Sequence, residues 1–247
     1  LAASSDDTAC VQVLIDAKAD PNVKDAKDWT ALICAASKGH TTSVQMLLDA
    51  KADIEAKRDA ECLGALGKAA LRGHSGCVRV LIDAKADLET VNSRGETALI
   101  FAAMGGDIQT VKILLEAKAN IEAKNTKGCT PLLAAVCKGY HECLQVLINA
   151  KADIEARTAN GSSALRLAAL EQQPACMRVL IDAKANIDAS SEDTIDALIV
   201  SAMKGNIACV SLLLEAKAHV RSQTKSGHQS TPLHLAASNG RNSTIRQ

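Results

Sequence analysis

Ala117-Lys118-Ala119-Asn120 lies near the middle of the chain, and close copies of this stretch recur along its whole length. The copies begin at Ala17, Ala50, Ala84, Ala117, Ala150, Ala183 and Ala216. Successive copies are 33, 34, 33, 33, 33 and 33 residues apart. A fixed period of this size predicts a stack of small structural repeats, each of which contacts only its neighbours.

A second motif recurs at a constant offset from the first. Its fullest form is Thr231-Pro232-Leu233-His234-Leu235-Ala236-Ala237, and weaker versions begin at Thr30, Thr97, Thr130 and Ser163. Thr-Pro-Leu-His together with a 33-residue period resembles the ankyrin repeat, and the resemblance covers the whole chain. The resemblance implies an all-α fold, an α-solenoid in which each repeat is a helix-turn-helix unit with a short β-hairpin finger.

The spacing predicts one array over residues 1–247, with about seven to eight repeats. We place a partial repeat at 1–24, repeats at about 25–57, 58–91, 92–124, 125–157, 158–190 and 191–223, and a partial repeat at 224–247. Arrays need polar capping repeats to shield their ends, and neither end shows one. We therefore expect truncation at both ends and a longer parent polypeptide.

Local signals predict where the helices of a repeat begin and end. In the middle repeat, Thr130 is expected to cap the first helix and Gly139 to end it. The second helix, about 141–149, is so apolar that it must be pressed between neighbouring repeats. Gly64 replaces the usual cap, so that first helix should begin weakly, whereas Asp196 remains a competent cap. Gln172 replaces the expected Gly, and the last finger has two extra residues within 227–230.

A lysine occupies the same position in seven repeats, where the ankyrin consensus usually has Gly. The row is Lys18, Lys51, Lys85, Lys118, Lys151, Lys184 and Lys217. We expect positive φ there, which costs a non-Gly residue on the order of 1 kcal/mol. The row could meet an acidic partner or a phosphate backbone. An acidic residue two positions before most of the lysines offsets their positive electrostatic field. This favours the interpretation that the row is a solvated edge of the array and not a binding surface.

Nine cysteines are spread through the chain. Five occupy one equivalent site, where two other repeats have Ser43 and Thr110, so we predict small buried side chains there: Cys10, Cys77, Cys143, Cys176 and Cys209. The odd total and the lack of a Cys-x-x-Cys pair favour a reducing, cytoplasmic location over a disulfide framework.

Composition and motifs argue against several function classes. Formal charge balances at zero, so nucleic-acid binding is not expected, and no apolar run is long enough for a membrane span. No nucleotide-binding, hydrolase or zinc-spaced pattern occurs, so we predict no enzyme, no cofactor and no metal site.

The ankyrin resemblance implies that His234 makes a structural hydrogen bond between repeats. His40, His74 and His141 are interpreted as loop or cap residues.

The family resemblance also implies a binding surface, formed by the finger tips and the exposed side of the first helices on the concave face. On this chain it comprises Lys24, Lys27, Trp29, Lys38, Arg58, Arg72, Arg94, Met104, Lys124, Lys127, Lys138 and Arg157. Trp29 is either an interface anchor or a ring folded back over its own finger, and both interpretations stay open.

We predict a monomeric, non-catalytic scaffold that binds a partner protein on this face. Two alternatives remain open. One is a regulatory or substrate-recruiting segment of a larger enzyme or channel. The other is nucleic-acid binding through the lysine row, which would give affinity that falls steeply with salt.

Overall fold

A computed structural model describes residues 7–56, 64–187, 196–220, 223–224 and 229–240. The chain divides into two compact units, Leu1–Thr126 and Lys127–Gln247, which we describe one at a time. Regular secondary structure in the described ranges is helical, and a single isolated bridge joins Arg157 to Ser163. The predicted all-α class is therefore confirmed. None of the described helices combines the length and apolarity needed to cross a bilayer.

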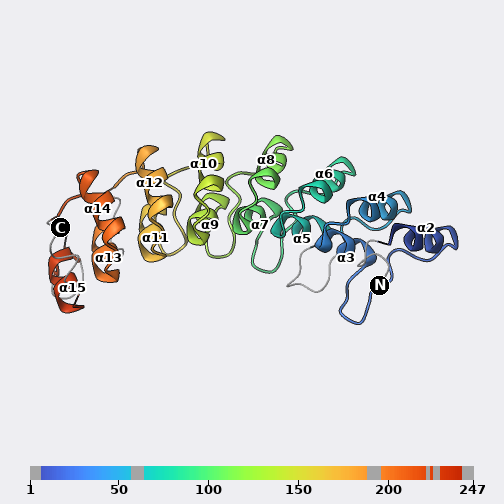
Figure 1. The fold of residues 1–247 in the computed structure, drawn as a ribbon, viewed down its shortest axis with the longest axis horizontal. Coiled ribbons are helices and arrows are strands. Elements are labelled where there is room, and N and C mark those ends of the chain that lie inside the picture. Colours follow the sequence, from blue (N-terminus) through green and yellow to red (C-terminus); the bar gives the residue numbers. More distant parts are fainter. Residues whose placement is uncertain (1–6, 57–63, 188–195, 221–222, 225–228, 241–247) are drawn as a thin grey trace. The chain divides into compact units, whose positions relative to one another are not determined.

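The first unit consists of paired helices in two rows (Figure 1). Its described helices are α2 (Thr8–Asp16), α3 (Ala31–Lys38), α4 (Thr41–Asp49), α5 (Ala65–Leu71), α6 (Ser75–Asp83), α7 (Ala98–Gly105) and α8 (Ile108–Glu116). The odd-numbered helices α3, α5 and α7 pack side by side, as do α2, α4, α6 and α8. Each odd helix also packs on the even helix that follows it.

The second unit repeats this arrangement. Its described helices are α9 (Pro131–Lys138), α10 (His141–Asn149), α11 (Ala164–Leu170), α12 (Pro174–Asp182), α13 (Ala197–Lys204), α14 (Ile207–Glu215) and α15 (Pro232–Ser238). One row contains α9, α11, α13 and α15, and the other contains α10, α12 and α14. We call the odd-numbered helices first helices and the even-numbered ones second helices.

Helix starts follow the predicted caps. Thr30, Thr97 and Thr130 each accept a hydrogen bond from the N–H three residues later. Asp196 caps α13 in the same way, at 2.8 Å from the N–H of Ile199, as predicted. Gly64 precedes α5 and offers it no side-chain cap, and the weak start expected there stays a prediction. The extra residues predicted within 227–230 lie largely outside the described ranges.

Positive φ occurs where the repeat pattern places it. The seven lysines of the recurrent row have φ values from 58° to 71°, which confirms the prediction. Gln172, which stands where Gly is expected, has φ 55°. Gly39 ends α3 at φ 82°, and a Cβ there would lie 2.7 Å from Nδ1 of His74, which begins the second helix of the next repeat. A side chain at position 39 would therefore meet both backbone strain and a steric clash.

The core confirms the predicted small-residue site, with one correction. Ser43, Cys77 and Thr110 are fully buried, and the equivalent cysteines of α10, α12 and α14 are at most 1% exposed. Cys10 was predicted to be buried and is exposed. The other second helices pack against the first helix of their own repeat, whereas α2 has no such partner among the described helices.

Backbone turns stand where hairpin fingers were predicted. The N–H of Asp25 donates to the carbonyl of Trp29 at 2.9 Å, and the N–H of Thr158 donates to the carbonyl of Ser162 at 3.1 Å. In the described ranges these hydrogen-bonded turns are too short to contain extended strands. The fingers are therefore tight turns that link a second helix to the next first helix.

Candidate functional site

Most of the residues expected on the binding surface are exposed. Of the twelve, the exposed ones are Lys24, Lys27, Lys38, Arg72, Arg94, Lys124, Lys127 and Lys138. Trp29, Met104 and Arg157 are half-buried, and Arg58 lies outside the described residues. The positions up to Lys124 belong to the first unit, and the last three positions belong to the second. Each unit therefore carries its own part of the expected surface.

Short polar side chains fix the backbone of the fingers. Oδ1 of Asp25 accepts from the N–H groups of Lys27 and Trp29 at 2.8 and 2.9 Å. Oδ1 of Asn92 does the same for Arg94 and Glu96, at 3.0 and 2.9 Å. These are Asx-type turns, in which a side chain replaces a backbone acceptor. The exposed side chains of Lys27 and Arg94 thus project from an ordered backbone.

Neighbouring fingers are also joined to one another. In the first unit the N–H of Thr126 donates to the carbonyl of Arg94 at 2.8 Å. In the second unit the N–H of Ala159 donates to the carbonyl of Lys127 at the same distance. Finger tips from adjacent repeats are therefore held at a fixed separation, which suits recognition of a partner by several side chains at once.

Basic side chains also gather at the far ends of the first helices. Lys38 and Lys138 lie in the last turns of α3 and α9, and Arg72 follows α5. Cations at these positions interact favourably with the carbonyl end of a helix, which explains their presence without a ligand. Met104 lies near the equivalent end of α7 and is half-buried.

Trp29 forms part of a cavity in the first unit. Its backbone N–H donates to Asp25, and Nζ of Lys68 on α5 lies 5.1 Å from the centre of the ring. The ring nitrogen Nε1 is enclosed and has no acceptor. The ring therefore lies against Lys68 of the next repeat, while the backbone N–H of Trp29 is bonded within its own finger.

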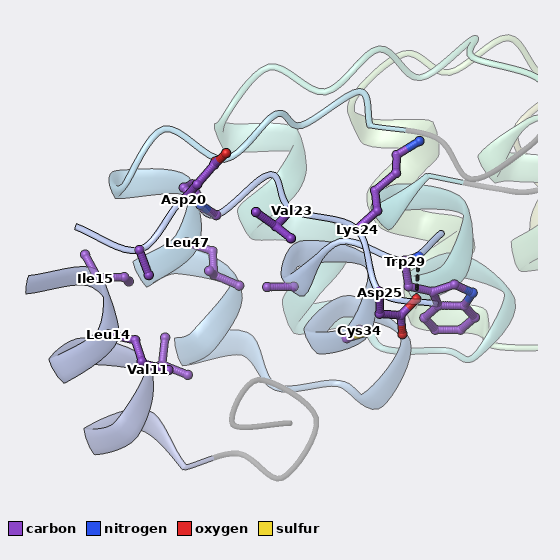
Figure 2. A pocket seen from close by; sticks show the side chains of 13 residues that line it. Val11, Leu14, Ile15, Asp20, Val23, Lys24, Asp25, Trp29, Cys34 and Leu47 are labelled. Carbon is purple, nitrogen blue, oxygen red and sulfur yellow. Dashed lines mark hydrogen bonds between the residues drawn. The ribbon is translucent and has the colours of Figure 1, made fainter. Parts of the chain in front are cut away.

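The cavity has a volume of about 310 Å³. Figure 2 shows Leu14 and Ile15 of α2 on one side and Trp29 with Asp25 on the other. Leu14 and Val23 at its rim are 52% and 64% exposed. The lining combines apolar walls with a few polar groups, which is the usual character of a ligand pocket.

Arg166 is a feature that the sequence analysis missed. It lies on the first turn of α11, at the position that His234 occupies in the fullest copy of the motif. Burial lowers the pKa of its guanidinium from the ordinary value. Alignment of the repeats could have found it, because Leu133 and Ile199 stand at the equivalent positions of the flanking repeats.

Histidines occupy structural positions. His40 and His74 precede α4 and α6 as capping residues, and His141 begins α10, as predicted. Nδ1 of His234 lies 2.8 Å from Oγ1 of Thr231 and accepts its backbone N–H at 3.3 Å. These bonds lie within one repeat and do not test the expected bond between repeats, which stays a prediction. The ring closes a capping box at the start of its own helix.

Burial and hydrogen bonding shift the pKa values of three cysteine thiols. A hydrogen bond from Cys129 lowers the pKa of the Cys137 thiol, with burial acting against it. Burial raises the pKa of Cys176 and of Cys209 to about 11, so these thiols stay protonated at neutral pH. Within the described ranges no three His, Cys, Asp or Glu side chains come together in a way that could hold a metal ion.

Comparison with known proteins agrees with this geometry. The family model described as "Ankyrin repeats (3 copies)" matches residues 57–125, 119–193 and 165–247, and "Ankyrin repeats (many copies)" matches 1–48. The chain belongs to the ankyrin-repeat family. Ankyrin repeats generally mediate protein–protein interaction, and the fold is typically non-catalytic.

Among solved structures, the human ASB11 ankyrin repeat domain superposes with a TM-score of 0.76 and 23% sequence identity. The match covers 84% of this chain and 92% of that one, and it shows a shared fold. No curated protein matches the sequence.

Proposed function

We propose that this ankyrin-repeat chain is a non-catalytic scaffold that binds a partner protein on its finger tips and first helices. The observation that carries the proposal is the Asx-type turn at the finger tip, where Asp25 and Asn92 fix the backbone that bears Lys27 and Arg94. A surface that is ordered before binding loses little conformational entropy when the partner arrives. The exposed cations give this surface a basic character that favours an acidic partner.

The proposal covers one array over residues 1–247, acting as a monomer in the cytoplasm. The repeat spacing supports a single array, because it stays at 33 residues on both sides of the boundary between the units. Thiols at equivalent core positions support a reducing compartment. The lysine row is the weaker alternative surface, because in most repeats an acidic residue stands two positions before the lysine and offsets its charge.

Affinity capture with the intact chain tests this proposal. The test variant carries Ala at Lys27, Arg94 and Lys127, which lie in the finger tips. The matched control carries Ala at Lys85, Lys118 and Lys151, which removes the same number of cations from the lysine row. We expect the finger variant to lose the captured partner and the control to retain it. Equal capture by both variants, or loss only in the control, would overturn the proposal.

A further inference from the structure

Arg166 is a charged residue at a core position of the repeat. Four equivalent residues, Ile33, Ile100, Leu133 and Ile199, are at most 1% exposed, whereas His234 in the last described helix is exposed. The first helices that carry Leu133 and Ile199 pack on α11 from either side. Arg166 is half-buried between them, so its guanidinium is partly removed from water.

Arg166 makes few side-chain hydrogen bonds to the protein. A guanidinium has five N–H donors. In the structure its side chain donates from one terminal nitrogen to Oγ of Ser162, at 2.5 Å, and Nε is enclosed without an acceptor. The neighbouring Arg157 donates to the carbonyl of Gly161 at 2.9 Å and closes its own finger. The two arginines therefore differ: Arg157 supports the turn, whereas Arg166 has an enclosed Nε–H group without an acceptor.

Arg166 also lacks an anionic partner among the described residues, where the recorded ion pair joins Arg178 to Glu215. Removing a charge from water without pairing it is costly, and the lowered pKa of Arg166 follows from that burial. An incoming carboxylate would supply the missing negative charge and would accept hydrogen bonds from the terminal N–H groups of this half-buried side chain. Its two oxygens fit the planar fork of a guanidinium, which a lysine cannot match.

We propose that Arg166 is a specificity-determining residue that binds an Asp or Glu side chain in an acidic segment of the partner. This inference rests on the proposed function and names the chemistry of the partner. The site lies at the base of the finger that contains Arg157, and this finger is bonded to the finger that contains exposed Lys127. An acidic segment along the two fingers would thus meet basic groups on its way to Arg166.

Direct observation of the Arg166 Nε–H group by NMR tests the inference. Arg166→Lys assigns the signal by removing it. The probes are a short peptide of alternating Glu and Ser residues and the same peptide with Gln in place of Glu. We expect the acidic peptide alone to shift the Arg166 signal. An unchanged signal at saturating acidic peptide, or an equal shift with the Gln peptide, would contradict the assignment.

Binding measurements with variants complete the test. Arg166→Leu places the residue of the equivalent position 133 at this site, so the variant should fold with an unchanged or raised melting temperature. We expect it to weaken binding of the acidic peptide at least about tenfold, and Arg166→Lys to weaken it less. If Arg166→Leu binds normally while the finger variant described above does not, the role of Arg166 is wrong and the proposed function stands. If neither variant weakens binding, both are wrong.

Discussion

The carboxylate of Glu55 accepts a hydrogen bond from the backbone N–H of Asp87, 2.8 Å away, and so joins two neighbouring repeats. Its other oxygen accepts from Oγ1 of Thr90 at 3.1 Å. Asn22, Glu89 and Glu155 make the equivalent bond to the repeat that follows, at 2.7 to 2.8 Å. In these four repeats a side chain thus ties the loop after a second helix to the next such loop.

Replacing Glu55 by Ala should therefore weaken the contact between repeats. Hydrogen bonds to charged groups contribute about 1.5–3 kcal/mol, so we expect the free energy of unfolding to fall by about that amount. Glu55→Gln keeps an oxygen acceptor and should lose less. Urea unfolding followed by the fluorescence of Trp29, the single tryptophan, measures the effect in the first unit. Glu116→Ala, at an exposed site, is the control, and an equal loss there would contradict the explanation.

Lys118→Gly should stabilise the protein. Lys118 has φ 70°, a conformation that costs a residue with a Cβ on the order of 1 kcal/mol and suits Gly. We expect a higher melting temperature. Lys112→Gly is the matched control, because Lys112 lies within helix α8, where Gly costs about 1 kcal/mol and should lower the melting temperature. A lower melting temperature in both variants would show that the left-handed backbone at Lys118 carries no strain.

Stability should fall at alkaline pH because of buried thiols. The pKa of Cys176 and of Cys209 is raised by burial from 9.0 to about 11. Between these values the native state holds protons that the unfolded chain has released, so the free energy of unfolding decreases as pH rises. This contribution is fully present below pH 9 and lost through about pH 11. Urea unfolding by circular dichroism should show a shallower decline for Cys176→Ala combined with Cys209→Ala; an unchanged slope would contradict the assignment.

The contact between Lys68 and Trp29 should contribute modestly to the first unit. A cation 5.1 Å from the ring centre is within the range of a cation–π interaction, worth about 0.5–1 kcal/mol at an exposed site. We expect Lys68→Gln to lower the free energy of unfolding by about that amount and to have no effect in a Trp29→Leu background. Because that background has no tryptophan, circular dichroism follows unfolding in all four proteins of the cycle. Equal losses in both backgrounds would show that the two side chains do not interact.

Sequence reasoning was most successful where the signal was local. Capping by Thr130, the start of α5 without a side-chain cap at Gly64 and the positive φ of Lys118 depend on residues a few positions apart, so the repeat pattern predicted them. It failed where a contact depends on a neighbouring element. Cys10 is exposed although its place in the repeat predicted burial, and Glu55 was overlooked because its acceptor role involves a backbone group in the next repeat.

The candidate surface was predicted only in part. Exposure of Lys27 and Arg94 follows from their place in turns, which the sequence signals clearly. Burial of the Trp29 ring nitrogen and of Nε in Arg166 depends on side-chain packing between repeats, which composition and spacing do not specify.

Hydrogen–deuterium exchange of the intact chain, with and without its captured partner, tests the central claim most directly. We expect added protection in the fingers around residues 25–29, 92–96 and 157–163 and in the first helices beside them. Protection confined to the second helices and the lysine row would contradict it.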